Sequence, residues 1–244
     1  MSKTALVMAG GTGGHIFPGL AIAQALLAGG WQVHWLGGKG APGSPSLESQ
    51  IVPARGIPFE AIEFGGLRGK GWMAKLMLPL RLAKAMLQSA RILRRVKPGV
   101  VIGLGGYVSF PAGLVCAITG KPLVLHEQNS VAGMANRYLA KVARKTYTAF
   151  PDVLDGARWI GNPLRREFIG QPEPALRFAA RRGPLRMLVL GGSLGASALN
   201  EVVPQALAAL PQPAPLGSAL CERLQRQTAL VVAYVVLAAS PPSS

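Results

Sequence analysis

The sequence lacks several features that would assign it quickly to a class of protein. Its two cysteines, Cys116 and Cys221, cannot form a disulfide framework and fit a reducing compartment. Its three histidines have neither close spacing nor a paired cysteine, so we expect no transition-metal site. No stretch approaches the ~20 apolar residues of a membrane-spanning helix. The apolar residues after Lys3 are interrupted by glycines and by Pro18, which argues against a signal peptide and favours a cytosolic domain.

Acidic residues are also scarce. The chain has 10 Asp and Glu against 26 Lys and Arg, a formal net charge of +16 at pH 7 and a pI of about 10.9. This balance favours anionic partners such as phosphorylated substrates or acidic lipid surfaces. We do not expect nucleic acid, because there is no basic-aromatic RNA motif and no recognisable DNA-binding unit. Apolar residues make up 50% of the 244 positions, enough for one large α/β domain or two smaller ones.

The most informative stretch runs from Leu6 to His15, an apolar segment that ends in glycines, a threonine and a histidine. The apolar residues suit a buried strand, the glycines allow a sharp turn, and Pro18 suits the first turn of a following helix. Such a unit presents free backbone N–H groups and the positive end of a helix dipole, which together bind phosphate or diphosphate. The alternative is a tight turn that binds no ligand. Thr12 and His15 argue against it, because they add a hydroxyl and a titratable ring to the loop.

Apolar and helical segments alternate along the rest of the chain, which predicts a parallel, doubly wound α/β sheet. Strands are expected at 5–8, 31–36, 58–64, 100–104, 122–125 and 146–150, and helices at 20–27, 47–52, 72–96, 115–118 and 134–143. Ligand groups gather at the carboxyl ends of the strands of such a sheet. The polar residues that follow the predicted strands are therefore expected to converge on one crevice: Thr12, His15, Tyr107, Ser109, His126, Glu127 and Asn129.

A second segment, Leu188 to Gly195, repeats the pattern of an apolar strand that runs into glycines around a hydroxyl residue. Residues 170–184 are rich in Pro and Arg and are typical of a linker, so a second Rossmann-like domain is expected to begin near Leu185.

The sequence does not match two other nucleotide-binding motifs. The first loop lacks the last glycine of the dinucleotide fingerprint, and Gly69-Lys70-Gly71 lacks the Ser or Thr of a Walker A loop.

Six motifs occur in order along the chain: Gly10-Gly-Thr-Gly-Gly-His15, Gly66-Leu-Arg-Gly-Lys-Gly71, Gly105-Gly-Tyr-Val108, His126-Glu-Gln-Asn129, Gly161-Asn-Pro-Leu-Arg165, and Gly191-Gly-Ser193 with Gly195-Ala196. Together they closely resemble the MurG family of bacterial glycosyltransferases, from about Lys3 to Leu210. The resemblance implies a GT-B fold, with the first Rossmann-like domain complete and the second only begun. It also implies inverting transfer of N-acetylglucosamine (GlcNAc) from UDP-GlcNAc to undecaprenyl-diphospho-muramoylpentapeptide (lipid I), which gives lipid II without a cofactor.

The family resemblance also implies a place in the cell. It predicts a peripheral protein on the cytoplasmic face of the inner membrane that acts in peptidoglycan synthesis, and hence in cell shape and cell division. Its partners would be UDP-GlcNAc, lipid I and an anionic membrane surface. Contacts with other cell-wall synthesis proteins stay open.

Carried over position by position, the resemblance assigns donor contacts to Thr12, Gly13, Gly14, Asn129, Arg165 and Ser193. Departure of UDP develops negative charge on the diphosphate, which a helix N-terminus, a hydroxyl and an arginine stabilise without a metal. The acceptor hydroxyl also needs a base. His15, with an ordinary pKa near ~6.5, is the first candidate, as the base or as a contact to the acceptor diphosphate, and Glu127 is the second. Tyr107 is expected on the acceptor side.

The stretch from Trp72 to Lys97 predicts an amphipathic helix, with Pro79 as a site for a kink. Arg81 and Lys84 belong to a basic face, and Trp72 belongs to the apolar surface beside it. We expect such a helix to bind an anionic leaflet in a salt-sensitive manner. The alternative is an ordinary helix packed on the sheet, because part of the apolar face must join the core.

No motif of the family follows Leu210. The apolar run 229–239 is too short to span a bilayer, so it is expected as a buried strand or as a poorly ordered end. We expect an N-terminal domain at 1–169, a linker at 170–184, the start of a donor-binding domain at 185–210 and an unrelated tail at 211–244, as in a truncated or frameshifted product. Two functions stay open: the transferase itself, and an inactive remnant that binds the membrane or lipid I.

Overall fold

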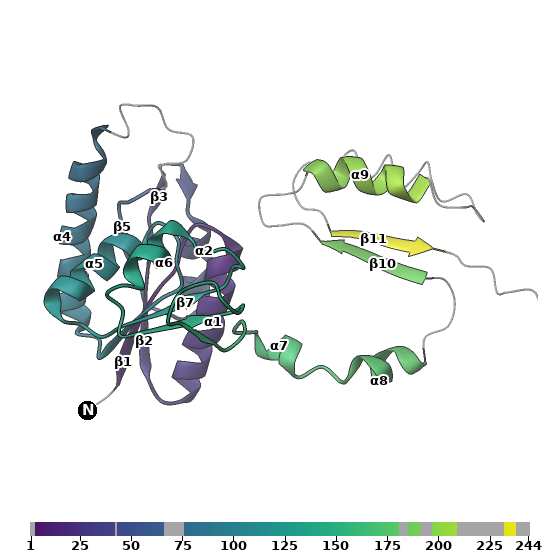
Figure 1. The fold of residues 1–244 in the computed structure, drawn as a ribbon, viewed down its shortest axis with the longest axis horizontal. Helices are drawn as coiled ribbons and strands as arrows, with labels where there is room; N and C mark the ends of the chain where they lie inside the picture. Colours follow the sequence, from purple (N-terminus) through teal and green to yellow (C-terminus); the bar gives the residue numbers. More distant parts are fainter. Residues whose placement is uncertain are drawn as a thin grey trace, which may run out of the picture. The chain divides into compact units, whose positions relative to one another are not determined.

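The structure is a computed structural model, and it describes residues 3–41, 43–65, 76–180, 185–190, 197–208 and 232–237. The chain divides into two compact units, Met1–Gly170 and Gln171–Ser244 (Figure 1). The strands of the first unit are β1 (Thr4–Met8), β2 (Gln32–Gly38), β3 (Gly40–Ala41), β4 (Ser44–Pro45), β5 (Phe59–Ile62), β6 (Val100–Gly103), β7 (Leu123–Glu127), β8 (Lys145–Thr148) and β9 (Arg158–Trp159). Its helices are α1 (Gly13–Ala28), α2 (Leu47–Ile51), the 3-10 helix η1 (Pro53–Arg55), α4 (Leu78–Val96), α5 (Ser109–Thr119), α6 (Met134–Leu139) and α7 (Arg166–Ile169).

Seven parallel strands form the main sheet of the first unit, in the order β5-β2-β1-β6-β7-β8-β9. The chain builds outward from β1 through β2 and β5, then crosses to β6 and continues in the opposite direction. This is the order of a Rossmann-like sheet, and its direction reverses between β1 and β6. The predicted α/β class and the doubly wound N-terminal domain are confirmed.

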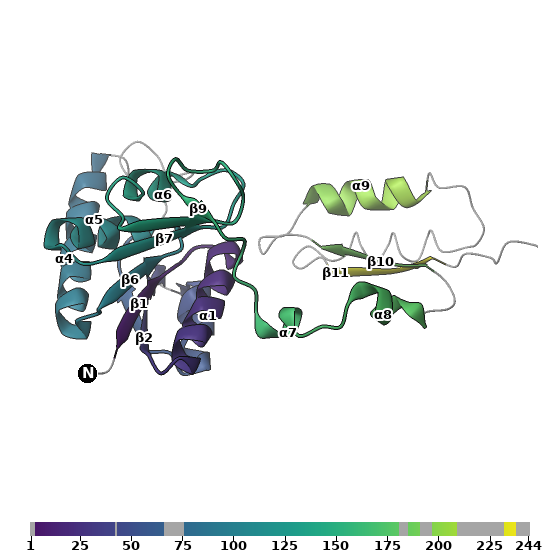
Figure 2. The same ribbon diagram turned by 60° about the horizontal axis from the view of Figure 1, so that its bottom comes forward.

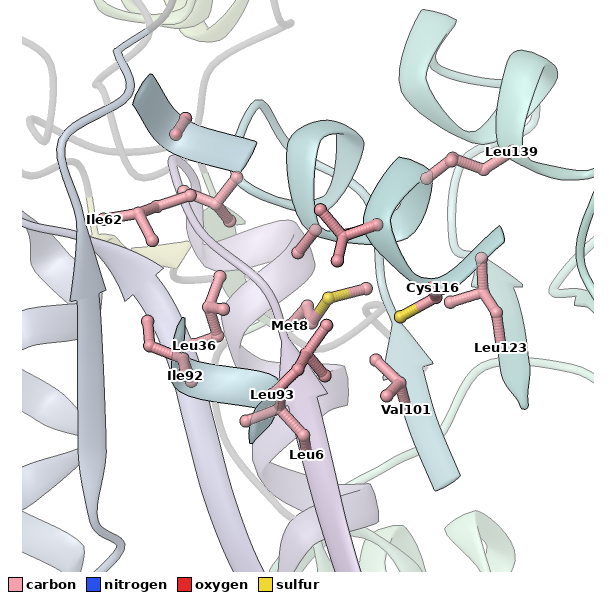
Figure 3. Close-up of a cluster of buried hydrophobic side chains, with 14 of the residues drawn as sticks. Leu6, Met8, Leu36, Ile62, Ile92, Leu93, Val101, Cys116, Leu123 and Leu139 are labelled. Atoms are coloured by element: carbon pink, nitrogen blue, oxygen red, sulfur yellow. The ribbon is translucent and has the colours of Figure 1, made fainter. Parts of the chain in front are cut away.

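β1 is buried on both of its faces, so its side chains alternate between two cores. Leu6 and Met8 join a cluster with residues of α4, α5 and α6 (Figure 3). Val7, together with Ala9 just after the strand, joins a second cluster with residues of α1. Figures 1 and 2 show the two sets of helices on opposite sides of the sheet. The alternation anchors β1 at the centre of the unit and leaves its carboxyl end open to the loops.

Trp35 fixes α1 against the sheet. Its indole Nε1 donates a hydrogen bond to the carbonyl oxygen of Ala9 over 3.0 Å, and its ring fills the space beside Gly19. A Cβ atom at Gly19 would lie 2.6 Å from the Trp35 ring, so the helix reaches this position only because residue 19 has no side chain. The start of α1 is thereby held close to the end of β1.

Three helix boundaries differ from those predicted. α1 begins at Gly13, well before the predicted start, because the second glycine pair is helical, so Pro18 lies inside the helix rather than in its first turn. α4 begins at Leu78, after a turn at Met77, so Pro79 falls in its first turn, where a missing N–H costs nothing, and the predicted start at Trp72 lies outside the described residues. α6 ends at Leu139, before the predicted end, since the backbone N–H of Arg144 already bonds to Leu123 as the chain enters β8.

The second unit contains α8 (Pro174–Ala179), β10 (Leu185–Leu190), α9 (Ser197–Ala208) and β11 (Val232–Leu237). α8 lies in the segment predicted as a linker. β11 lies in the apolar run for which a strand was one of two expectations, and it pairs antiparallel with β10, from Leu185 opposite Leu237 to Leu190 opposite Val232. The domain limits predicted at residues 169, 184 and 210 stay predictions.

Candidate functional site

The first glycine-rich loop lies at the carboxyl end of β1, at the point where the sheet changes direction. Gly11 turns with φ +95°, a conformation that glycine adopts without strain, and Thr12 is the N-cap of α1. The Thr12 hydroxyl does not cap the helix, because its Oγ1 lies 3.0 Å from Nδ1 of His15. The first backbone N–H groups of α1, at Gly13 and Gly14, are therefore at the open end of a helix, where anions bind.

His15 is half-buried in the first turn of α1. Burial lowers the pKa of its imidazole below the ordinary value, and the negative charge of Glu127 opposes this shift. The ring lies against Gly105, where a Cβ atom would be 3.0 Å from Cδ2 of His15 and 3.2 Å from Nδ2 of Asn136. The glycine thus lets His15 and Asn136 approach each other, and the lowered pKa keeps the imidazole neutral and able to accept a proton near neutral pH.

Glu127 ends β7 and is buried, and its carboxylate accepts four hydrogen bonds. Asn129 donates from its backbone N–H over 3.0 Å and from Nδ2 over 2.8 Å, both to Oε1. Gly133 donates from its backbone N–H over 3.0 Å and Asn136 from Nδ2 over 2.9 Å, both to Oε2. A carboxylate with both oxygens bonded in this way orders the loop that follows β7, and each of its oxygens already accepts two hydrogen bonds.

Two residues expected in the crevice hold the framework together instead. His126 is buried, its Nε2 donates to the carbonyl oxygen of Gly161 over 2.9 Å, and its Nδ1 lies 3.0 Å from Nε2 of Gln128. Burial lowers its pKa, and the Gly161 hydrogen bond and the charge of Glu127 oppose this. Ser109 is also buried, and its hydroxyl donates to the carbonyl oxygen of Gly105 over 2.7 Å and lies 3.2 Å from that of Met8. The expectation that these two side chains line the crevice is wrong, since both are buried and hydrogen-bonded to backbone carbonyl groups.

Tyr107 extends from the loop after β6 across the first loop. Its hydroxyl donates to Oε1 of Glu48 over 3.4 Å, and burial together with the Glu48 charge raises the pKa of Tyr107 to about 12. Glu48 is fully buried, and sequence reasoning did not find it. Its position inside a short predicted helix gives no signal, because the groups it contacts come from other parts of the chain.

Arg165 is held beside the first turn of α1 by two aromatic rings. Its guanidinium lies 5.0 Å from the ring centroid of Phe17 and 4.9 Å from that of Phe168, within the range of cation–π attraction. Phe17 follows His15 by two residues, so the stacking keeps a positive charge near the start of α1. Ser193, the last of the predicted donor contacts, lies outside the described residues.

The helix α4 carries part of the surface expected to meet a membrane. Arg81 is exposed and forms no ion pair with any described residue, whereas the ammonium of Lys84 pairs with Glu63 over 2.5 Å. Leu76, Leu80 and Leu87 are between 60% and 68% exposed. Trp72 lies outside the described residues.

Among the residues that the structure describes, no group of three or more His, Cys, Asp or Glu side chains is placed to hold a metal ion. Of the helices in the same ranges, none combines the length and the apolar character that crossing a bilayer requires.

Comparison with known proteins gives consistent matches. The model of the glycosyltransferase family 28 N-terminal domain matches residues 5–148. A protein of Polaromonas naphthalenivorans (strain CJ2), named UDP-N-acetylglucosamine–N-acetylmuramyl-(pentapeptide) pyrophosphoryl-undecaprenol N-acetylglucosamine transferase, is 66% identical over 209 residues, which are 86% of this chain and 58% of that protein. The protein of the same name from Albidiferax ferrireducens is 62% identical, over 85% of this chain and 54% of that protein. The chain spans about half the length of the curated relatives that it matches.

Two solved structures resemble the fold. The crystal structure of Acinetobacter baumannii MurG has a TM-score of 0.70 and 35% identity, covering 91% of this chain and 64% of that one. The glycosyltransferase of kitacinnamycin has a TM-score of 0.58 at 16% identity, covering 86% of this chain and 64% of that one, and so bears on the fold alone. The resemblance to MurG inferred from the six sequence motifs is confirmed, and the chain belongs to glycosyltransferase family 28.

Proposed function

We propose that this chain acts in the transfer of GlcNAc from UDP-GlcNAc to lipid I, with inversion at the anomeric carbon and lipid II as product. The observation that carries the proposal is the pairing of Thr12 with His15 at the start of α1. When Nδ1 of His15 donates its proton to Oγ1 of Thr12, Nε2 is left unprotonated. An imidazole with a lowered pKa in this tautomer suits removal of a proton from a sugar hydroxyl.

The reaction steps follow from the charges that develop. The muramoyl C4 hydroxyl attacks the anomeric carbon of GlcNAc, its proton passes to Nε2 of His15, and the bond to UDP breaks. The leaving diphosphate gains negative charge, which the N–H groups at Gly13 and Gly14 and the guanidinium of Arg165 stabilise. Asn129 and Ser193 are proposed donor contacts on the strength of their motifs, and Tyr107 is proposed for the acceptor side.

A transfer assay on the whole chain tests this proposal. With UDP-GlcNAc and a soluble lipid I analogue, we expect His15→Ala to lower kcat/KM by about 10²- to 10⁴-fold, the usual contribution of a general base. The matched control is His34→Ala, a histidine on β2 whose ring faces Glu60. Unchanged turnover in His15→Ala would exclude His15 as the base. If the chain binds the acceptor analogue and transfers nothing, its function is restricted to acceptor binding.

We also propose that α4 brings the chain to the inner leaflet of the cell membrane, as a peripheral protein that meets its lipid acceptor there. Exposed leucines at positions 76, 80 and 87 supply apolar surface, and Arg81 supplies a charge with no described ion-pair partner. Glu63 neutralises part of the Lys84 charge, so Arg81 is the more effective of the two predicted basic contacts. Apolar area beside basic side chains is the pattern of helices that lie in an anionic interface.

Vesicle sedimentation measures this contact. Arg81→Glu is expected to weaken binding to acidic vesicles by about 30-fold, since each basic residue near such a surface contributes about 1 kcal/mol and the substitution replaces that attraction with a repulsion of similar size. Arg55→Glu on η1, an exposed arginine on another helix of the same unit, is the charge-matched control. Binding that is equal for neutral and acidic vesicles at low salt would contradict the proposal.

A further inference from the structure

A carboxylate lies beneath the first glycine-rich loop. Glu48 belongs to α2, a five-residue helix whose N-cap, Ser46, accepts a hydrogen bond from the backbone N–H of Ser49 over 3.2 Å. The Ser46 hydroxyl also donates to the carbonyl oxygen of Gly38 over 2.6 Å. These bonds tie the short helix to the end of β2, and the Glu48 side chain points inward with 0% of it exposed.

Three separate elements donate hydrogen bonds to this carboxylate. The backbone N–H of Gly38, at the end of β2, donates to Oε1 over 3.1 Å. The backbone N–H of Gly11, in the loop after β1, donates to Oε2 over 3.3 Å. The Tyr107 hydroxyl, in the loop after β6, donates to Oε1 over 3.4 Å. Glu48 therefore joins the ends of three neighbouring strands at the edge of the sheet where a ligand is expected.

The glycines around Glu48 leave room for it and for Tyr107. A Cβ atom at Gly10 would lie 2.4 Å from Oε1 of Glu48, and one at Gly38 would lie 2.3 Å from the Tyr107 hydroxyl. A Cβ atom at Gly106, where φ is +80°, would lie 2.3 Å from the carbonyl oxygen of Gly10. The absence of side chains lets the two loops touch along their backbones above the carboxylate.

A buried negative charge under an anion-binding loop is electrostatically unfavourable for the anion. Like charges repel, and the effect is stronger where water is excluded. A contribution of Glu48 to anion binding must therefore come from the shape that it gives the loop. We propose that Glu48 is a positioning residue: by holding Gly11, Gly38 and Tyr107 together, it sets the loop geometry in which the start of α1 binds a diphosphate. This role rests on the proposed function.

Neutralising Glu48 tests this proposal. If the carboxylate acts mainly by charge repulsion, its loss should tighten diphosphate binding, whereas if it positions the loop, its loss should weaken that binding. Glu48→Gln keeps the size of the side chain but replaces one acceptor oxygen with an NH₂ group that cannot accept from Gly11. We expect inorganic diphosphate to bind the whole chain about tenfold more weakly in Glu48→Gln, by calorimetry, since a lost hydrogen bond to a charged group has that effect. Glu63→Gln, an exposed carboxylate on the same unit, is the control. Unchanged or tighter diphosphate binding in Glu48→Gln would overturn the proposal.

A second measurement separates this inference from the proposed function. Amide hydrogen exchange at Gly11 and Gly38 should be faster in Glu48→Gln than in Glu63→Gln, with the folded state checked by circular dichroism. Tyr107→Phe, which removes one hydroxyl, should speed exchange at Gly11 less. If the unmodified chain fails to bind diphosphate, the proposed function loses support, and exchange alone then decides about Glu48. Unchanged exchange at both glycines would overturn the positioning role.

Discussion

Two buried carboxylates organise opposite sides of the candidate site, and they do so in different ways. The Glu127 cluster, made of Glu127, Asn129, Gly133 and Asn136, is local, since the donors follow the glutamate by two, six and nine residues. The Glu48 cluster, made of Glu48, Gly11, Gly38 and Tyr107, is assembled from donors that lie 37, 10 and 59 residues away. One carboxylate shapes its own loop, and the other joins three loops. Substitutions in the two clusters should therefore have different consequences.

The largest effect is expected from Glu127→Ala. Four donors, two of them backbone N–H groups, lose their acceptor in a buried place, so the free energy of unfolding should fall by about 3–5 kcal/mol. Chemical denaturation followed by circular dichroism measures the change. Glu63→Ala, which breaks an exposed ion pair that solvent screens, should lower the free energy of unfolding far less. Equal losses in the two variants would remove the distinction between an ordering carboxylate and a surface one.

A methyl group placed beside each carboxylate distinguishes the clusters further. In Gly37→Ala the new Cβ would lie 2.7 Å from Cγ of Glu48 and 2.7 Å from Cε2 of Phe59, so overpacking should cost about 1–3 kcal/mol. In Gly133→Ala the nearest atom, Oε2 of Glu127, would be 3.7 Å away, and the N-cap preference of glycine over alanine should cost less than about 1 kcal/mol. Denaturation midpoints give both values, and a larger loss in Gly133→Ala would reverse the comparison.

The smallest effect concerns the two histidines beside these clusters. Burial lowers the pKa of both His15 and His126, so the unfolded chain binds protons first as the pH falls. The stability that each histidine contributes should be fully present above the ordinary pKa of about 6.5 and should decline as the pH falls from there toward the lowered pKa of the folded state. Denaturation at a series of pH values should show a flatter acid limb in His15→Gln and in His126→Gln. If stability falls as steeply with acid in both variants as in the unmodified chain, the two histidines are not the cause of the acid dependence.

The sheet could be read from the sequence because its signals are local. Buried strands such as β1 and β6 are short apolar runs that end in glycine, and their parallel pairing follows from the alternation with helices. The polar residues after these strands were identified for the same reason. The boundaries of α1 and α4 were misplaced because two helical glycines and a proline in a first turn are ambiguous without the tertiary contacts.

The contacts of the site were not readable in the same way. Ser109 and His126 follow strands, as ligand-binding residues do, and only the structure turns them toward backbone carbonyls. Glu48 shows the converse, because nothing in a five-residue helix indicates that its carboxylate meets Gly11 and Tyr107. A pattern gives the edge of the sheet to which a residue belongs, whereas the direction of its side chain depends on packing between distant segments.

The long reach of Glu48 has a consequence for the order of folding. Its hydrogen bonds span as many as 59 residues, and the loop entropy for such contacts must be overcome before the contacts can contribute. We expect the local helices and the pairing of β1 with β2 to form first, and the turn at Gly11 to settle only after β6 has docked. Refolding followed in parallel by helix signal and by diphosphate binding should then show binding recovering last, so that the anion stabilises only molecules whose sheet is already complete.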